Sequence, residues 1–522
     1  VLVRATNLPI KMQPRLLLLA ISCRPTCRFG HFLRYLPPSI ISAFVDDLRR
    51  EIRHAFERTL ALPADTVASS PPEMASHFQF FQALSAGGIG FDDPARVSPA
   101  AYLASMASTL PIHRRDPAVA TFVKDPSNWA TCPSLILRDA YNVFHRVTST
   151  AAYSALPLAD CPIAARPTLR ATLNDVSGSP SLHRLHLLSG MRSQSRFSRL
   201  LATEELNTAL AHPSLHPLAF ARLRHAAVPP SHLLFTMCSV SDAHALSDAE
   251  TTYLYLYRLG VPFPSLATSA ALPFASCNVK CSSYPPHRPF PNAKLLCLHS
   301  LGHHYTMCGV GGHSIRLHDL IVRLIAATAM RETGCAAHLE KGLGSSTAAG
   351  KKIDAVLSFA NRTVYAGSAA TAVMTVDVSR LCPLLPSHLQ TAAKDAAATI
   401  DERAREKNAK HLAGCIGLGR AFLPIVVTTL GGIGPPASRD FLSSLFANSM
   451  AAERASGGSG QLTAKRRSDF FRSIMVLLVR KQHLATADLA TPLARAAPTP
   501  PPKPSTHRKR KANANAANPH AA

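Results

Sequence analysis

Acidic residues are scarce in this sequence. Only 31 Asp and Glu stand against 56 Lys and Arg, which leaves a formal net charge of +25. A surplus of this size attracts polyanions, so nucleic acid is the first class of partner to consider. A GC-rich genome that favours Arg, Ala and Pro codons is the alternative origin of the charge.

Long apolar runs are also missing. No run reaches the roughly 18 residues that a membrane span needs, so we expect no membrane partner. The most apolar N-terminal stretch, residues 16–23, follows Arg4, Lys11 and Arg15 but has no small-residue cleavage site. That disfavours a secretory signal peptide.

The chain has one tryptophan, Trp129, and twelve scattered cysteines that form no dense disulfide framework. Scattered cysteines fit a reducing compartment. Hydrophobic residues make up 47% of the chain and charged residues 17%, which is typical of globular proteins. Because the chain starts at Val1 and not at methionine, we expect a fragment of a longer reading frame.

The N-terminal half is predicted to be mainly helical. Residues 1–110 contain a helical stripe after Pro37-Pro38, formed by Ile41, Phe44, Val45, Leu48, Ile52, Ala55 and Phe56. A further helix is expected to start at Ser98, as N-cap, with Pro99 in its first position. Residues 111–265 form a proline-interrupted linker region with short helical patterns, such as 197–210.

The C-terminal half divides into three parts by composition. Residues 266–312 are rich in Cys, His, Pro and Gly, residues 313–490 alternate helical and strand-like patterns, and residues 491–522 form a basic tail. The tail is expected to be disordered, because it is rich in Pro, Ala and Asn and carries six Lys and Arg residues but no acidic residue.

Two valine-rich runs each contain one aspartate, Asp354 and Asp377. If the intervening segment reverses between residues 365 and 366, the two aspartates lie directly opposite each other on one face of a hairpin. Two like charges so close together are unfavourable unless a cation, such as Mg²⁺, lies between them. The alternative is that both are solvated residues at strand ends.

An alanine-rich helix, roughly residues 388–413, follows the second run. Its packing stripe passes through Ile400 and Ala404 and continues to Lys407 and His411. A lysine on a packed face calls for a carboxylate or a phosphate, and with the two aspartates it suggests metal-assisted phosphodiester hydrolysis. Glu340 is a candidate third carboxylate. The alternative is that the stripe ends at Ala404.

A second cluster has the spacing of a structural zinc site. Cys277, Cys281, His304 and Cys308 form a C-x₃-C pair followed by H-x₃-C, which offers four tetrahedral ligands. Cys297 and His303 are alternative ligands. The segment "GLGSSTAAGKK", residues 342–352, is not a phosphate-binding loop, because five residues and not four lie between Gly344 and Gly350 and no Ser or Thr follows Lys351.

The order of these features resembles the C-terminal part of non-LTR retrotransposon polyproteins. The segments that carry the resemblance are the Cys-Cys-His-Cys cluster, "IRLHDLIVRLI", "KKIDAVLS", "MTVDVSRLCPL", "REKNAKH" and "FLPIVVTTLGGIGPPA". In that family a zinc knuckle and a restriction-like endonuclease domain follow the reverse transcriptase. The N-terminal "GGIGFDDPARVSPAAYLASM" is similar to the region after the polymerase palm, including the thumb.

The resemblance implies a mixed fold, with a helical thumb-like region over residues 1–110 and an α/β restriction-endonuclease-like domain over 313–490. It assigns Asp354 and Asp377 to Mg²⁺, Lys407 to catalysis and His318 to the family's Arg-x-His helix, and it makes Cys277, Cys281, His304 and Cys308 the Zn²⁺ knuckle. DNA and element RNA are the implied partners, no small-molecule substrate is expected, and the implied location is the nucleus, otherwise the cytoplasm.

The sequence departs from the family pattern at several points. Ile353 precedes Asp354 where proline or alanine is usual, His411 stands where tyrosine is frequent, and Ser379 replaces the usual lysine of restriction enzymes. The Tyr-x-Asp-Asp polymerase signature is absent, so no reverse transcription is expected of this chain. Two alternatives to a DNA-nicking endonuclease remain open here: a catalytically dead nucleic-acid-binding remnant, and a chance translation without a stable fold.

Overall fold

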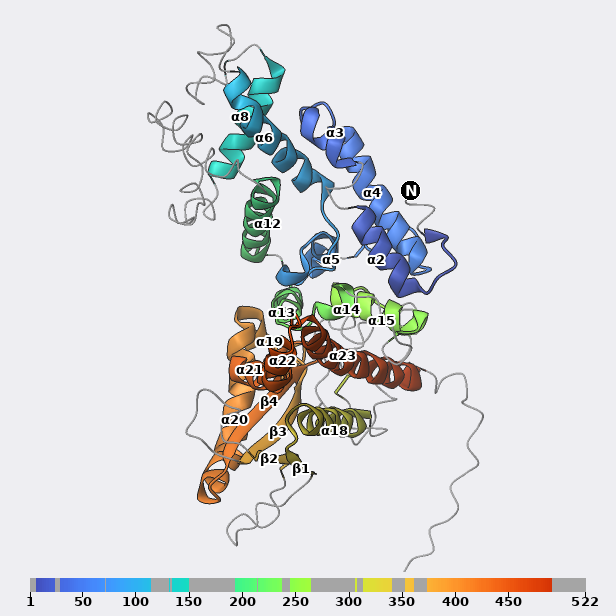
Figure 1. Cartoon of the computed structure of the whole chain (residues 1–522). Coiled ribbons are helices and arrows are strands. Elements are labelled where there is room, and N and C mark those ends of the chain that lie inside the picture. The colour runs from blue at the N-terminus through green and yellow to red at the C-terminus, as the bar shows by residue number, and fades with distance from the viewer. Residues whose placement is uncertain are drawn as a thin grey trace, which may run out of the picture.

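Helices form one half of the molecule, and a single sheet with its covering helices forms the other (Figure 1). This architecture comes from a computed structural model. It describes residues 6–23, 29–70, 72–113, 131, 134–149, 193–213, 215–236, 245–263, 306–307, 313–339, 353–360 and 373–490. The basic tail from residue 491 onward lies outside these ranges.

The described elements run as follows. The helical half contains α2 (Met12–Ser22), α3 (Phe29–Tyr35), α4 (Ser42–Thr59), η1 (Pro72–Met74), α5 (Ser76–Phe80), η2 (Leu84–Ala86), α6 (Pro94–His113), α8 (Leu135–Thr148) and α12 (Ser193–Ala211). The connecting helices are α13 (Pro217–Ala226), α14 (Leu233–Thr236) and α15 (Asp248–Leu259). The sheet half contains α18 (His313–Thr333), β1 (Ala336–Leu339), β2 (Ala355–Ser358), β3 (Val373–Leu381), α19 (Pro386–Lys394), α20 (Ala396–Gly417), β4 (Ala421–Thr428), β5 (Ile433–Gly434), α21 (Pro436–Ser444), α22 (Ala447–Ala455) and α23 (Gln461–Ala490).

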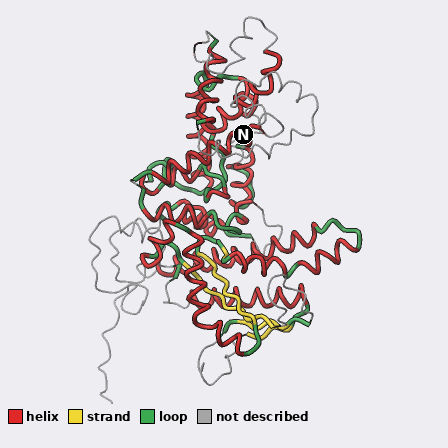
Figure 2. The backbone as a smooth tube through the Cα atoms, turned by 90° about the vertical axis from the view of Figure 1, so that its left-hand side faces the viewer, coloured by secondary structure: helices red, strands yellow, loops and turns green. Residues whose placement is uncertain are grey.

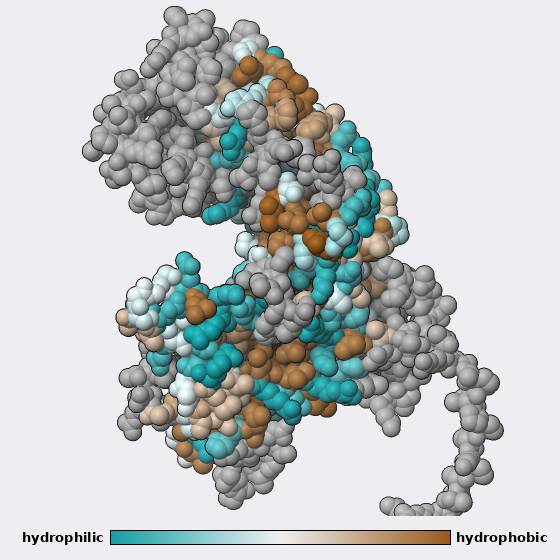
Figure 3. Space-filling view, turned by 45° about the vertical axis from the view of Figure 1, so that its right-hand side comes forward, coloured by the Kyte–Doolittle hydropathy of each residue, from teal (hydrophilic) through white to brown (hydrophobic). Residues whose placement is uncertain are grey.

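Helix α4 forms where the apolar stripe predicts it, and Leu48, Ile52 and Phe56 are buried in the main core. Phe44 is the exception, because it faces outward and 43% of its surface is exposed. It joins Phe32 and Tyr35 of α3, and Ile40 of the connection between α3 and α4, as an exposed apolar residue. Apolar residues, brown in Figure 3, are visible on the surface of this helical half.

Helix α6 begins one turn earlier than the sequence suggested. It starts at Pro94, so Ser98 and Pro99 lie inside it and the prediction of an N-cap at Ser98 is wrong. The Asp93 carboxylate accepts a hydrogen bond from the Ala95 amide at 3.0 Å, which satisfies a donor of the first turn. The same rule of an N-cap followed by proline therefore applies, but to Asp93-Pro94.

The sheet has the order β1-β2-β3-β4-β5, and only β3 and β4 are parallel. In the β2–β3 hairpin Ala355 is opposite Val376 and Val356 is opposite Thr375. This register confirms the predicted centre of the reversal, and one further step along it brings Asp354 to the level of Asp377. A slip of one residue would have sent the two side chains to opposite faces.

The predicted long alanine-rich helix is two helices. Asp395 has extended backbone angles, φ −153° and ψ 119°, which end α19 and begin α20. Its carboxylate accepts a hydrogen bond from the Ala397 amide at 2.8 Å, so it caps α20. Helix α18 covers residues 313–333, at the start of the region where the sequence alternates helical and strand-like patterns.

Helices cover both faces of the sheet (Figures 1 and 2). On one face, Ile400 and Ala404 of α20 pack against Leu381 and Val426. On the other face, α18 and α23 pack against alternate residues of the same strands, among them Val376, Val378, Ile425 and Val427. Strand β3 is therefore buried on both sides along nearly its whole length, including its polar residues Thr375, Asp377, Ser379 and Arg380.

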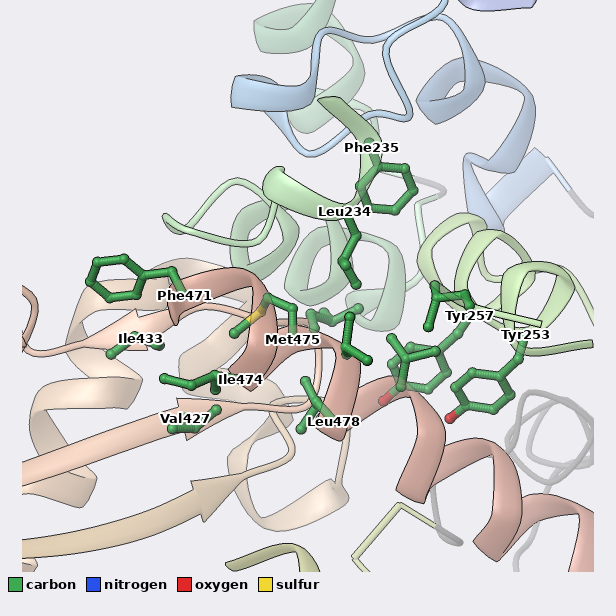
Figure 4. Packing of buried hydrophobic residues seen from close by; sticks show 14 of the residues in the cluster. Leu234, Phe235, Tyr253, Tyr257, Val427, Ile433, Phe471, Ile474, Met475 and Leu478 are labelled. Carbon is green, nitrogen blue, oxygen red and sulfur yellow. The ribbon is translucent and has the colours of Figure 1, made fainter. Parts of the chain in front are cut away.

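One core connects the two halves. In Figure 4, Ile474, Met475 and Leu478 of α23 lie between the sheet residues Val427 and Ile433 and the connecting helices α14 and α15. The Tyr257 hydroxyl donates a hydrogen bond to Thr429 Oγ1 at 2.9 Å across this junction. The described part of the 111–265 region thus packs on both halves of the molecule.

Among the helices that the structure describes, none combines the length and the hydropathy that crossing a lipid bilayer requires.

Candidate functional site

Asp354 lies at a bend directly before β2. Strand β2 pairs with β3 only as far as Ala355, while β3 continues to Leu381. The amide of Val378 lies past the end of β2, and it donates a hydrogen bond to Asp354 Oδ2 at 2.6 Å. A side-chain oxygen thus replaces a strand partner and fixes the carboxylate against the edge of β3.

Asp377 lies on β3 at the position opposite Asp354, and its side chain is buried. Its Oδ2 lies 2.7 Å from Lys407 Nζ, which comes from α20 on the same face of the sheet. The packing stripe of α20 therefore does continue past Ala404, and the lysine on it is paired with a carboxylate. A buried carboxylate without such a partner would be costly.

His318 reaches the site from α18, past the end of β2. Its Nε2 lies 3.0 Å from Asp354 Oδ2 and 3.1 Å from the Val378 carbonyl oxygen, and its Nδ1 lies 3.1 Å from Asp319 Oδ1. Both ring nitrogens face acceptors, which favours the doubly protonated, cationic ring. The hydrogen bond to Asp354 is the largest cause that raises the His318 pKa to about 9.

The two carboxylates are shifted in opposite directions. Burial raises the pKa of Asp377, the negative charge of Asp354 adds to this, and Lys407 offsets it only in part. Burial also acts to raise the pKa of Asp354, but the hydrogen bond and charge of His318, with the Val378 amide, outweigh it and lower the pKa. Neighbouring carboxylates with such divergent environments are a frequent feature of functional sites.

His411 is one helical turn after Lys407 and is buried against the same strands. Its ring centroid lies 5.7 Å from that of Phe422 on β4. The positive charge that it carries when protonated acts to lower the Asp377 pKa. His411, which departs from the family pattern, therefore lines the site.

The structure brings together four of the residues singled out in the sequence, which are His318, Asp354, Asp377 and Lys407. Glu340 lies outside the described residues. So do the zinc candidates Cys277, Cys281, His304 and Cys308 and their alternatives Cys297 and His303, as does the loop of residues 342–352. Asp319 and the Val378 peptide group also belong to the site. Sequence reasoning missed both, although Asp319 directly follows His318.

The oxygens gathered here suit a hard divalent cation. Asp354 and Asp377 supply carboxylate oxygens, and the Val378 carbonyl oxygen faces the same cationic ring as Asp354. Mg²⁺ prefers such oxygen ligands and is often held by one or two carboxylates, with water and phosphate oxygens completing its shell. Among the described residues no group of three or more His, Cys, Asp or Glu side chains is arranged to hold a metal.

Comparison with known proteins gives no identification, since neither a protein-family model nor a curated protein matches this sequence.

Proposed function

We propose that the sheet half is a Mg²⁺-dependent endonuclease centre that nicks DNA, as in the non-LTR retrotransposon polyproteins that the sequence resembles. The observation that carries the proposal is the meeting of two carboxylates from one strand pair with a lysine from the helix that crosses it. The order α18, β1, β2, β3, α19, α20, β4 supports a restriction-endonuclease-like core.

Asp354, Asp377 and the Val378 carbonyl oxygen would hold the ion. When bound, Mg²⁺ supplies Lewis-acid stabilisation of the charge that develops on the reacting phosphate. Lys407 stabilises the same charge from the α20 side or helps to activate the attacking water, since its ammonium group lies 2.7 Å from Asp377 Oδ2. His318 fixes the orientation of Asp354 and keeps that carboxylate ionised.

The wider proposal follows the resemblance. The net charge of +25 fits DNA and element RNA as partners. The zinc knuckle of Cys277, Cys281, His304 and Cys308 would add a second contact to nucleic acid, and the place of action would be the nucleus. In the parent element such a nick exposes the 3′ end that primes reverse transcription.

A nicking assay tests this function. Supercoiled plasmid is incubated with the purified chain in Mg²⁺ or in EDTA, beside Asp354→Asn, Asp377→Asn and Asp401→Asn. Asp401 is an exposed aspartate of α20, six residues before Lys407, and serves as the matched control. We expect Mg²⁺-dependent nicking that falls about a hundredfold or more in the first two variants and is unchanged in the control.

The second candidate is a nucleic-acid-binding remnant of a decayed element. One observation favours it, because Lys407 pairs with Asp377 and His318 pairs with Asp354, so the site is neutralised by its own side chains. A wild-type chain that binds plasmid and leaves it uncut in Mg²⁺ would support the remnant and refute the nuclease.

A further inference from the structure

Arg380 carries a charged side chain into the core of the sheet half. It lies near the end of β3, and only 7% of its surface is exposed. Its Nη1 donates hydrogen bonds to Ser314 Oγ at 2.8 Å and to the Ser314 carbonyl oxygen at 3.4 Å, and its Nη2 donates one to the Thr306 carbonyl oxygen. Both partners are uncharged. Burying a cation in this way is costly, and an apolar side chain of similar volume would avoid the cost, so we expect this guanidinium group to do more than fill space.

The Ser314 contact fixes the first turn of α18. Four residues later on the same helix, His318 lies against Asp354 Oδ2 and the Val378 carbonyl oxygen. Residues four apart share one face of a helix, so Ser314 and His318 both face the strand. Val378 and Arg380 are two residues apart on β3, so they share one side of that strand.

The two contact points have matching spacings. Four residues of helix rise ~6 Å, and two residues of strand rise ~6.6 Å. Helix α18 therefore lies along the end of β3, beside which Figure 1 shows it, and is attached to that strand at two points one helical turn apart. Leu317 lies between these points on the helix and is buried in the main core. A single contact would leave the helix free to pivot, whereas two contacts fix its direction.

The Thr306 contact holds the chain ahead of the helix. Thr306 is buried, lies seven residues before the start of α18 and belongs to the end of the region rich in Cys and His. One guanidinium group therefore holds both the first turn of α18 and a residue that precedes it. This explains why an arginine, with several donors in a fixed plane, stands at this position of β3.

We propose that Arg380 is a positioning residue of the candidate metal site. By fixing the first turn of α18 along β3, it determines where His318 holds Asp354 Oδ2 and the Val378 peptide group. It acts through Ser314 and α18. Its effect on metal binding rests on the proposed nuclease function, but its effect on the Val378 peptide group requires neither a metal nor cleavage.

Amide hydrogen exchange of Val378 tests this role in the full chain, with EDTA present and valine selectively labelled with ¹⁵N. The Val378 amide donates its hydrogen bond to Asp354 Oδ2 at 2.6 Å, so its exchange rate reports whether the carboxylate stays in place. Arg380→Met keeps most of the side-chain volume and removes the hydrogen bonds. Ser314→Ala removes one acceptor from a half-buried position and leaves the guanidinium group in the core.

Arg222→Met is the matched control. Arg222 of α13 is also a buried arginine with uncharged partners, since its guanidinium group donates hydrogen bonds to Gln79 Oε1 and to the Met74 carbonyl oxygen. These partners lie in the helical half, away from α18. The control therefore removes a buried guanidinium group without touching the contacts that hold the first turn of α18.

We expect Val378 exchange to be about tenfold faster in Arg380→Met, less accelerated in Ser314→Ala and unchanged in Arg222→Met. The double variant Arg380→Met/Ser314→Ala should exchange no faster than Arg380→Met, because the contact is already lost. In a separate titration without EDTA, Mn²⁺ should bind about tenfold more weakly to Arg380→Met than to wild type, as for other groups that orient metal ligands from behind.

Unchanged Val378 exchange in Arg380→Met would overturn the proposal. Equal acceleration in Arg222→Met would also overturn it, because the effect would then reflect global stability. If Arg380→Met does not fold, Ser314→Ala decides, and a wild-type exchange rate in that variant would refute the role of the contact. Unchanged Mn²⁺ affinity in Arg380→Met would refute its role at the metal site. Where Val378 exchange rises as expected but wild type neither binds Mn²⁺ nor nicks plasmid, the positioning role stands and the nuclease fails.

Discussion

His318 Nε2 lies 3.0 Å from Asp354 Oδ2 and 3.1 Å from the carbonyl oxygen of Val378, so one imidazole ring joins α18 to both strands of the β2–β3 hairpin. These two oxygens are among the three that we assign to the metal. The ring therefore holds a carboxylate and a peptide group in place, and it supplies positive charge where the site gathers negative charge.

The His318 contact predicts a pH-dependent stability. A histidine whose folded-state pKa is raised to about 9 contributes stability that is fully present below its unfolded pKa of about 6.5 and is lost as the pH rises through 9. Urea unfolding at pH 6, 7.5 and 9.5 should show a decline for wild type over this window. The decline should be smaller in His318→Gln, which cannot be protonated. Parallel pH curves for the two chains would show that the ring is not cationic in the folded protein.

The Lys407–Asp377 pair predicts that the stability effects of the two single substitutions are not additive in a double-mutant cycle. Lys407→Met leaves a buried carboxylate without its partner, which should lower the free energy of unfolding by about 2 kcal/mol at pH 7. Adding Asp377→Asn removes the uncompensated charge and should recover most of that loss. Denaturant unfolding of the four chains gives the coupling free energy. Additive losses would mean that the two groups do not interact in the folded protein.

The cap of α20 predicts a local stability effect. Asp395→Ala removes the acceptor of the Ala397 amide and should cost about 1 kcal/mol of unfolding free energy. Asp395→Ser keeps an acceptor at this position, so most of the stability should remain. Equal free energies of unfolding for Asp395→Ala and Asp395→Ser would argue that this cap does not divide α19 from α20.

Local rules explain much of what could be predicted. The β2–β3 register followed from the position of the reversal, because opposite residues in a hairpin are fixed by its centre. Lys407 was placed on the inner face by helical spacing alone. The α19–α20 break was missed, although Asp395 is a favoured cap residue, because the alanine-rich periodicity continues across it.

Long-range contacts could not be read from spacing. His318 and Asp354 are 36 residues apart, and the fold brings them together only because β2 ends one residue before β3 turns its edge toward α18. The resemblance named His318, but neither the family pattern nor the periodicity gave its partners. The outward position of Phe44 also depends on long-range packing. The apolar stripe of α4 does not show how much of that helix the rest of the protein covers.

The central claim is that Asp354 and Asp377 hold one divalent ion together, and binding of Mn²⁺ tests it most directly. Electron paramagnetic resonance measures free Mn²⁺ in a titration of wild type, Asp354→Asn, Asp377→Asn and the Asp401→Asn control. We predict one Mn²⁺ per chain in wild type and control that is lost in both of the other variants. Mn²⁺ binding that persists in either Asp354→Asn or Asp377→Asn would contradict a shared metal centre.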